Sequence, residues 1–480
     1  MSTAVLTLEG GYQLRTSPDG MEAWLEPPPS PAEYPSLREK LKEVGLTGLL
    51  DPPVREDGRL IVARGRPPEP GEDGKIEFLV DFSRGPREIS PHRVDWREVN
   101  ALVSVPAGTV VARITPPTPG IPGLTVWGEP VPAQPGRKIR IREELPSTDQ
   151  DLAAVEDLIK TEEKGGQVDL TLGPGLIYDS REGTIVAREG GFLELRGKHL
   201  RLYPVYTLGG DVDWTTGNIR FYGKKLTIKG TVRRGFLVES AGDLEIHGNV
   251  EDGVRIQTGG SLIVQGIVKG ERIEVHAERE AFLNIVEYAS VKVRGNLTVS
   301  GYLLQARVIV GGMLSVMGKE GILGGEVFVE GSAVVSVLGS PAFVKTLIKV
   351  GYNYEVAEEV KKLEEEFSRL DEVTDRMKEA LVQGIRLARA GRLTPEKRVI
   401  VEKLYQVLKK RILEMADIKE RIKALETRLD KGDFAFLQVT MRAYPNVVVG
   451  IGKNAILLKK EHGPGIFRLE GAKIAFRGQN

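Results

Sequence analysis

A six-residue spacing of apolar side chains dominates the middle of this 480-residue chain. Eight apolar residues follow one another at this interval: Leu226, Val232, Val238, Leu244, Val250, Ile256, Leu262 and Val268. Glycines repeat at three times the interval, at Gly230, Gly248 and Gly266. A fixed short period is the signature of a solenoid, and a coil of about 18 residues is too short for helical repeats. The spacing therefore predicts a narrow, three-sided parallel β-helix.

Two further expectations follow from the same pattern. Connections between parallel strands are right-handed by default, so we expect a right-handed coil. A period of six is also typical of left-handed hexapeptide acyltransferases, but Arg233 and Glu239, which follow two of the rungs, are long and polar where such repeats have small residues. We expect the repeating glycines at tight corners, because glycine adopts a positive φ without strain.

Helical spacing replaces the six-residue period after Gly351. Two runs of apolar residues step by three or four positions: Val356, Val360, Leu363, Phe367, Leu370, Val373, Met377, Leu381, Ile385 and Ala388, then Leu404, Leu408, Ile412, Met415, Ile418, Ile422, Leu425 and Leu429. Gly391 ends the first run, and Thr394-Pro395-Glu396 begins the second with proline at the first helical position. Two helices of similar length with a short connection predict an antiparallel coiled-coil hairpin.

The hairpin reads as an insertion, because strand-like spacing resumes after it. We therefore expect Gly351 and Asp433 to lie close in space. The N-terminal part is expected to be α/β, with helices at Leu37–Val44 and Asp149–Lys160. The fold class is thus mainly β with α. We expect four regions: an N-terminal region at 1–175, with a division into lobes 1–95 and 96–175 left open, the β-solenoid at 176–352, the hairpin at 353–432, and strands at 433–480 that cap or rejoin the solenoid.

Composition narrows the classes of function. The chain has 67 basic and 67 acidic residues, so it lacks the basic excess typical of nucleic-acid-binding proteins. It has no cysteine, which rules out disulfides and thiolate metal sites. Residues 1–13 lack the features of a signal peptide, and no stretch is apolar enough for a membrane span. These features predict a cytoplasmic protein without a membrane span.

Several segments resemble the flagellar assembly protein A (FapA) family. They are DGMEAWL at 19–25, ARGRPPEPGEDGKIEF at 63–78, VDWREVN at 94–100, PPTPGIPGLTVWG at 116–128, and residues 212–250, 321–327, 338–340 and 349–352. The resemblance implies a family N-terminal region followed by a right-handed β-solenoid, similar in kind to that of bactofilins. It also implies a role in flagellar assembly or polar organisation, with no enzymatic activity attached to the fold.

Several residues are candidates for chemistry, and each also has a structural interpretation. Asp211 and Asp213 are paired carboxylates that would share one face of a strand, as in β-helical polysaccharide enzymes, or they hydrogen-bond the turn at 215–218. His247 lies beside a corner glycine, where it could mimic an acyltransferase base, or it simply faces solvent. None of the five histidines has metal-ligand spacing.

Two basic or glycine-containing segments are weaker candidates. Gly450-Ile451-Gly452-Lys453 lacks the spacing of a phosphate loop. In residues 137–142, basic side chains alternate with isoleucine, which suits an RNA-binding strand or a protected edge strand. Without interleaved aromatic residues, the edge strand is favoured.

We therefore predict a non-enzymatic cytoplasmic scaffold of the FapA type, linked to flagellar assembly or polar organisation. Alternatives are a bactofilin-like self-assembling polymer and a β-helix acyltransferase or carbohydrate-active enzyme. No catalytic, cofactor-binding or metal-binding residues are assigned. We expect one or more protein partners and no nucleic acid, and a homo-oligomer is left open. The candidate interaction surface comprises Pro119, Gly120, Pro122, Gly123, Trp127, Asp211, Asp213 and Asn218.

Overall fold

The computed structural model describes residues 5–8, 10–83, 85, 87–90, 93–99, 101–144, 169–392, 394–429, 432 and 434–478. Its contacts divide the chain into two units. Unit 1 contains residues 1–82, 107–189 and 193–202, and unit 2 contains residues 83–106, 190–192 and 203–480. The expected helix at Asp149–Lys160 lies outside the described residues.

Unit 1 begins with an antiparallel sheet of five strands in the order β1-β2-β3-β5-β4. The strands are β1 (Val5–Thr7), β2 (Gln13–Thr16), β3 (Glu22–Glu26), β4 (Leu49–Glu56) and β5 (Arg59–Arg64). Helix α1 (Tyr34–Glu43) packs Leu37 and Leu41 into one core with Leu25 and Val62 of the sheet. It ends before Gly45, whose φ of 88° closes the helix.

Unit 1 also contains two further groups of strands. Strands β15 (Leu176–Asp179), β16 (Thr184–Ala187), β10 (Val110–Thr115) and β6 (Lys75–Phe78) form an antiparallel sheet in that order. Strands β13 (Ile141–Glu143), β14 (Leu170–Leu172) and β18 (His199–Tyr203) pair in parallel. A two-stranded pair joins β11 (Gly123–Leu124) to β12 (Pro130–Val131).

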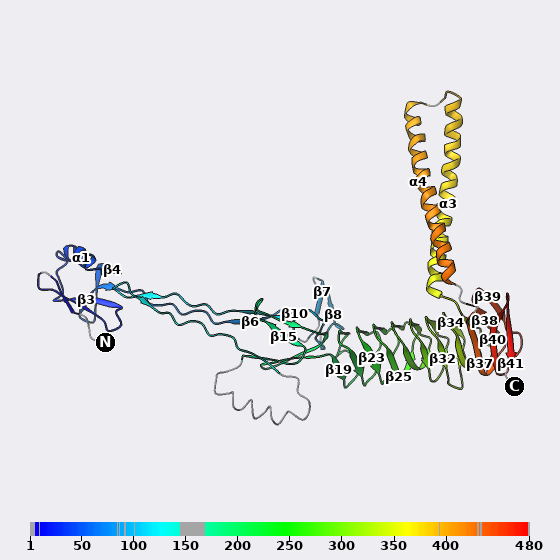
Figure 1. The fold of residues 1–480 in the computed structure, drawn as a ribbon, viewed down its shortest axis with the longest axis horizontal. Coiled ribbons are helices and arrows are strands. Elements are labelled where there is room, and N and C mark those ends of the chain that lie inside the picture. The colour runs from blue at the N-terminus through cyan, green and yellow to red at the C-terminus, as the bar shows by residue number, and fades with distance from the viewer. Residues whose placement is uncertain are drawn as a thin grey trace. The chain divides into compact units, whose positions relative to one another are not determined.

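Unit 2 is a β-solenoid of about eight turns before residue 350, and the predicted fold class is confirmed (Figure 1). One parallel sheet stacks β19 (Val205–Leu208), β21 (Lys225–Ile228), β23 (Asp243–Ile246), β25 (Leu262–Lys269), β27 (Ala281–Glu287), β29 (Leu297–Val299), β32 (Leu314–Val316) and β35 (Ala333–Leu338). A second stacks β20 (Ile219–Phe221), β22 (Leu237–Ser240), β24 (Arg255–Thr258), β26 (Glu274–Ala277), β28 (Ser290–Val293), β31 (Arg307–Val310), β34 (Gly325–Val329) and β36 (Thr346–Val350).

The third side of each coil is short. Single bridges link Val212 to Val232, Val232 to Val250 and Val250 to Val268. The second half of β27, β30 (Leu303–Leu304) and β33 (Ile322–Leu323) continue this side. In the same unit, β9 (Ser104–Val105) pairs with the first two residues of β17 (Gly191–Arg196), and β7 (Arg87–Ser90) pairs with β8 (Arg93–Asp95).

The six-residue period is the inner face of the solenoid. All eight apolar residues of the period are buried, with at most 1% of their surface exposed. The register confirms the coil length, because Leu226 stacks on Leu244 and Leu244 on Leu262. Later coils vary, since the residue stacked on Leu262 is Ala281, followed by Leu297 and Leu314. One continuous apolar core therefore runs through coils that could not fold singly.

The repeating glycines have a different role from the predicted one. None of Gly230, Gly248 and Gly266 has a positive φ. Instead, a Cβ at Gly248 would lie 2.4 Å from the carbonyl oxygen of Gly230, and one at Gly266 would lie 2.2 Å from that of Gly248. Positive φ occurs in a second series with the same 18-residue interval, at Gly217, Gly235 and Gly253. The first series permits close stacking, and the second makes the turn.

Helices α3 (Tyr354–Arg389) and α4 (Pro395–Leu429) pack side by side as the predicted hairpin (Figure 1). We call the residues that pack between the two helices the seam. Four of the apolar residues expected in it are exposed, so the prediction is wrong at Val373, Ile385, Ala388 and Ile412. On α3, Thr374 and Gly384 lie in the seam. On α4, Arg411 lies in the seam and its neighbour Ile412 does not. The seam keeps a regular alternation of three and four residues, which places polar and small residues inside it.

The chain rejoins the solenoid after the hairpin. Strand β37 (Phe436–Ala443) pairs in parallel with β35, and β38 (Val447–Ile451) with β36, so together they continue the coils. Strands β39 (Asn454–Leu457), β40 (Gly465–Glu470) and β41 (Lys473–Gly478) then pair antiparallel and cover the end. Gly351 lies beside Gly432 and Ala435. Asp433 is outside the described residues.

Candidate interaction site at the base of the hairpin

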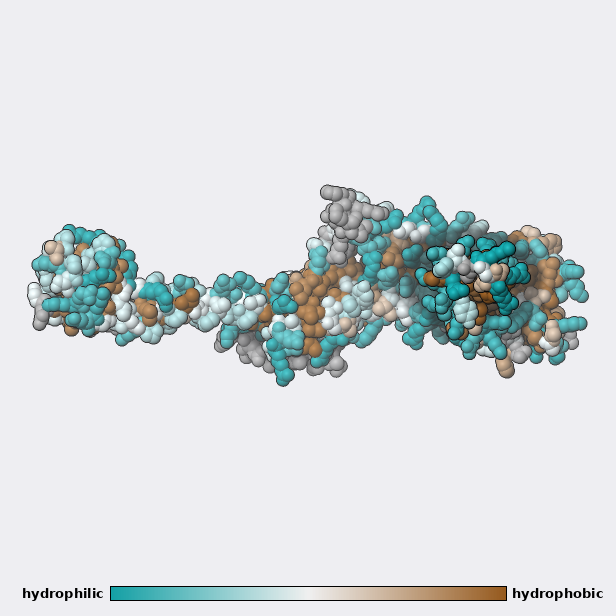
Figure 2. Space-filling view, turned by 90° about the horizontal axis from the view of Figure 1, so that it is seen from above, coloured by the Kyte–Doolittle hydropathy of each residue, from teal (hydrophilic) through white to brown (hydrophobic). Residues whose placement is uncertain are grey.

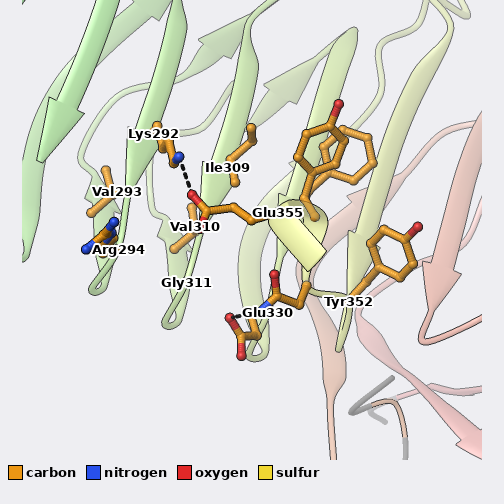
Figure 3. Close-up of a pocket in the computed structure, with 12 residues that line it drawn as sticks. Lys292, Val293, Arg294, Ile309, Val310, Gly311, Glu330, Tyr352 and Glu355 are labelled. Carbon is orange, nitrogen blue, oxygen red and sulfur yellow. Dashed lines mark hydrogen bonds and ion pairs between the residues drawn. The ribbon is translucent and has the colours of Figure 1, made fainter. Parts of the chain in front are cut away.

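A hollow of about 200 Å³ lies where α3 leaves the second sheet of the solenoid (Figure 3). Neighbouring coils contribute its floor through β28, β31 and β34, and residues 352–355 form its wall. Because parallel strands stack in register, Lys292 and Ile309 occupy equivalent positions on adjacent coils. The stacking therefore gathers side chains that are far apart in the sequence.

Aromatic side chains form one wall of the hollow. The ring of Phe328 lies 4.4 Å from that of Tyr354 and 6.5 Å from that of Tyr352, measured between centroids. Two cations cover these rings: Lys349 Nζ lies 3.4 Å from the Tyr352 centroid, and the Arg307 guanidinium lies 5.3 Å from that of Tyr354. Such contacts are each worth about 0.5–1 kcal/mol at exposed sites. They hold the first turn of α3 against the solenoid.

Polar contacts complete the attachment. Lys292 forms an ion pair with Glu355, and the Arg307 guanidinium donates a hydrogen bond to the Tyr354 hydroxyl. Asn353 is the N-cap of α3, because its Oδ1 accepts a hydrogen bond from the backbone N–H of Val356 at 3.0 Å. Its Nδ2 donates to Glu330 of the solenoid at 2.9 Å (Figure 3). One side chain thus starts the helix and ties it to a coil.

The electrostatics of the hollow stabilise the contacts at the base of α3. The hydrogen bond from Lys292 lowers the pKa of Glu355, which keeps that carboxylate ionised and paired. Burial raises the pKa of Tyr352 and Tyr354, so both phenols stay neutral near pH 7. The lining contains no nucleophile activated by an adjacent base. Its contacts instead set the position of the hairpin base.

Sequence reasoning did not find this hollow. The Tyr352-x-Tyr354 pair at the end of the solenoid was an available signal, because it places two aromatic rings at the point where the helix begins. Lys292, Arg307 and Phe328 carry no such signal, since their meeting depends on the register of three separate coils.

The predicted proline–glycine surface is part of a three-segment bundle in unit 1. Residues 65–74, 115–124 and 129–139 run together and exchange backbone hydrogen bonds: Ile121 N–H donates to Glu69, Gly71 N–H to Gln134, and Gly136 N–H to Thr118. The segment at 66–75 is therefore one member of this bundle. Pro119 and Pro122 are exposed on it.

Glycines allow the three segments to lie so close together. A Cβ at Gly120 would lie 2.6 Å from the Glu69 carbonyl oxygen, and one at Gly123 would lie 2.4 Å from that of Arg66. Trp127 is half-buried and packs against the core below α1. Of these predicted interaction residues, Gly120, Gly123 and Trp127 therefore support the local structure.

Asp211, Asp213 and Asn218 make separate structural contacts at the first coil. Asp211 accepts a hydrogen bond from Thr231 N–H at 2.7 Å and forms an ion pair with Arg233 at 2.7 Å. Asp213 accepts hydrogen bonds from the backbone N–H and the hydroxyl of Thr215, and the bond from the hydroxyl lowers the pKa of Asp213. Asn218 accepts from Leu237 N–H and donates to Glu98. Neither carboxylate lies in a named strand, and each has its own hydrogen-bond partners.

The remaining sequence candidates are also separated. His247 contacts Glu245 at 3.0 Å, and His276 contacts Glu278 at 2.9 Å. Gly450 and Ile451 end β38, and Gly452 and Lys453 form the turn to antiparallel β39, whereas a phosphate loop requires a following helix. The basic segment ends in β13, which lies at the edge of its sheet. Within the described residues, no group of three or more His, Asp and Glu side chains is arranged to hold a metal ion.

Neither of the long helices, nor any other helix in the described part of the chain, combines the length and hydrophobicity that a bilayer crossing requires.

Comparison with known proteins supports the architecture. Residues 204–474 match the Flagellar Assembly Protein A beta solenoid domain, and residues 12–152 match the Flagellar Assembly Protein A N-terminal region. No curated protein and no solved structure shows a significant match. The solenoid match alone covers more than half of the chain, and it includes the inserted hairpin and the closing strands. The chain therefore belongs to the FapA family.

Proposed function

We propose that this protein is a non-enzymatic cytoplasmic scaffold in flagellar assembly, in which the solenoid holds the hairpin in position for a protein partner. Family membership supports the flagellar role. The observation that carries the scaffold role is the way α3 leaves the solenoid. An N-cap, an ion pair and an aromatic cluster fix its first turn to stacked coils.

The continuity of the solenoid supports the same proposal. Strands β37 and β38 continue the coils on the far side of the insertion, so both ends of the hairpin start from the same rigid core. A rigid base limits the volume that the hairpin samples, which lowers the entropic cost of binding a partner there. We also propose that the four regions of the chain are functional divisions, with the exposed Pro119 and Pro122 as a second interaction surface.

The polymer and enzyme alternatives have less support. A polymer that grows by end-to-end stacking of coils requires a free edge of a parallel coil. At the C-terminal end, β40 and β41 pair antiparallel beyond β37, and β39 covers β38. An enzyme requires convergent catalytic groups, whereas Asp211, Asp213 and His247 each have separate structural partners.

Excising the hairpin tests the proposal directly. Because Gly351 lies beside Gly432, residues 353–431 can be replaced by a short Gly-Ser linker with little change to the coils. In a strain that lacks the native gene, we expect this variant to be stable but to leave flagellar number or motility impaired, while the full chain restores both. Circular dichroism and thermal unfolding of the purified variant verify that the solenoid is intact.

Two results would contradict the proposal. Full restoration of flagellation by the excised variant would show that the hairpin is dispensable. Normal flagellation in the strain without the gene would remove the flagellar role itself.

A further inference from the structure

The half of the hairpin farthest from the solenoid has exposed apolar residues on both helices. Val373 and Leu387 of α3 are 45% and 44% exposed, and Ile400 and Val407 of α4 are 63% and 47% exposed. We call these four residues the distal row. They lie outside the seam that joins the two helices, so the hairpin itself does not bury them. Exposed apolar residues on both helices are typical of a binding surface.

The four residues lie on one side of the hairpin. Gly384 meets Val401 across the seam, which sets the register of the two helices. On α3, Val373 precedes the seam residue Thr374, and Leu387 lies two heptads further along the same face. On α4, Ile400 and Val407 precede the seam residues Val401 and Leu408. Equivalent flanking positions of antiparallel helices face each other. The distal row therefore borders one groove, which extends about 21 Å along α3.

Basic side chains border this groove. Arg369 and Arg376 lie within one turn of Val373 on α3, and Lys403 and Lys410 follow Ile400 and Val407 by three residues on α4. All four are exposed, and Arg376 also lies 3.9 Å from Glu372. Residues 380–411 contain nine basic and two acidic residues, although the whole chain is neutral. Viewed end-on, the hairpin shows hydrophilic residues around hydrophobic ones (Figure 2).

We propose that this groove binds an acidic amphipathic helix of a protein partner. The apolar face of that helix would cover the distal row as the third member of the bundle, and carboxylates beside that face would meet Arg369, Arg376, Lys403 and Lys410. A helix-in-groove contact of this kind uses apolar anchors spaced by three or four residues. The inference rests on the proposed function, because it names the chemistry of the partner that the hairpin presents.

Charge and geometry disfavour the other occupants. Two distal halves would bring like charges together if a second copy paired tip to tip. Pairing of tip to base would place the distal row against residues 355–372 of α3, among which no large apolar side chain is exposed to cover it. An interfacial membrane contact buries a helix face by about 5–10 Å. Val373 lies about 24 Å from the hairpin turn at 1.5 Å per residue, too far for a tip inserted end-on.

The test uses the full chain and two labelled peptides of about three heptads. Both peptides have leucine at the a and d positions, and they carry either glutamate or lysine at the flanking positions. By fluorescence anisotropy, we expect the chain to bind the glutamate peptide at least tenfold more tightly than the lysine peptide. The double variant Ile400→Glu, Val407→Glu should lose that binding, and Lys403→Glu with Lys410→Glu should reverse the preference.

Leu413→Glu is the matched control, because Leu413 is 64% exposed on α4 but lies away from the groove. It should leave binding unchanged, and circular dichroism should show the same helix content in all variants. Equal binding of both peptides, or of neither, would overturn the proposal. So would a dimer, or binding to phosphatidylserine vesicles, that Ile400→Glu with Val407→Glu abolishes. If only this test fails while hairpin excision still impairs flagellation, the scaffold function stands.

Discussion

Gly384 of α3 lies so close to Val401 of α4 that a Cβ at Gly384 would be 2.7 Å from Val401 Cγ2. Glycine inside a helix is unfavourable by about 1 kcal/mol relative to alanine. The contact offsets this cost by letting the two helices approach near the turn. The same contact sets the register that places the distal row on one side of the hairpin.

Replacing Gly384 by leucine should separate the distal part of the two helices. The added side chain has no room beside Val401, and overpacking of this kind costs about 1–3 kcal/mol. Spin labels at Glu379→Cys and Gln406→Cys would report the separation, since the chain has no other cysteine. Gln383→Leu, an exposed neighbour, is the control and should leave the distance unchanged. An unchanged distance in the Gly384→Leu variant would contradict the close contact.

Gly248→Ala should destabilise the solenoid. The new Cβ would lie 2.4 Å from the carbonyl oxygen of Gly230, and the next coil prevents the backbone from moving away. We expect the free energy of unfolding to fall by about 1–3 kcal/mol, as for overpacking elsewhere. Urea denaturation measures the change. Gly209→Ala is the control, because no atom lies within 4 Å of its Cβ position. Equal stability of the two variants would show that the coils tolerate side chains at Gly248.

The solenoid could be predicted because its period reports burial directly. Leu226, Leu244 and Leu262 share one inward position on successive coils, so the sequence interval is also the structural interval. The role of Gly248 could not be predicted in the same way. A positive φ and a close backbone contact both select glycine, and only the register of neighbouring coils distinguishes them.

The hairpin seam and the site at its base show where sequence periodicity becomes ambiguous. Hydrophobicity alone favours Ile412 over Arg411 and Val373 over Thr374, but the packing alternation of three and four residues selects the less apolar member of each pair. At the base, Lys292 and Glu355 are 63 residues apart. Their meeting depends on coils of unequal length between them, which no local pattern encodes.

The attachment of α3 should weaken in acid. Lys292 lowers the pKa of Glu355 below its usual value of about 4.5, so the folded state favours the ionised carboxylate. The resulting stabilisation is fully present above the usual pKa and is lost as the pH falls through the lowered one. Thermal unfolding from pH 7 to pH 3 should therefore show an acid-sensitive component that Glu355→Gln removes. Glu364→Gln, on an exposed position of α3, should retain the component.

The result that would contradict this assignment is an identical pH dependence of unfolding in the wild-type and Glu355→Gln proteins. In that case other carboxylates would account for the acid sensitivity, and the Lys292–Glu355 pair would contribute nothing measurable to the hairpin base.

Asn353 links the start of α3 to the solenoid through two hydrogen bonds that substitution can separate. Its Oδ1 caps the helix at Val356 N–H, and its Nδ2 donates to Glu330. Asn353→Ala removes both bonds, and loss of a cap costs about 1 kcal/mol. Asn353→Asp retains the capping oxygen but places a carboxylate beside Glu330. We therefore expect Asn353→Asp to keep the helix cap but to weaken the attachment of α3 to the solenoid. We expect Asn353→Ala to lose both the cap and the attachment.

Hydrogen exchange at residues 354–360 reads out the cap, because fraying of the first turn exposes these amides. Spin labels at Glu366→Cys on the hairpin and Ser315→Cys on the solenoid measure the distribution of distances between the two parts. The Asp variant should show native exchange with a broadened distance distribution, whereas the Ala variant should change both. If Asn353→Asp leaves the distribution as narrow as in the wild type, the bond to Glu330 does not orient the hairpin, and the Lys292–Glu355 pair and the aromatic cluster around Phe328 must do so.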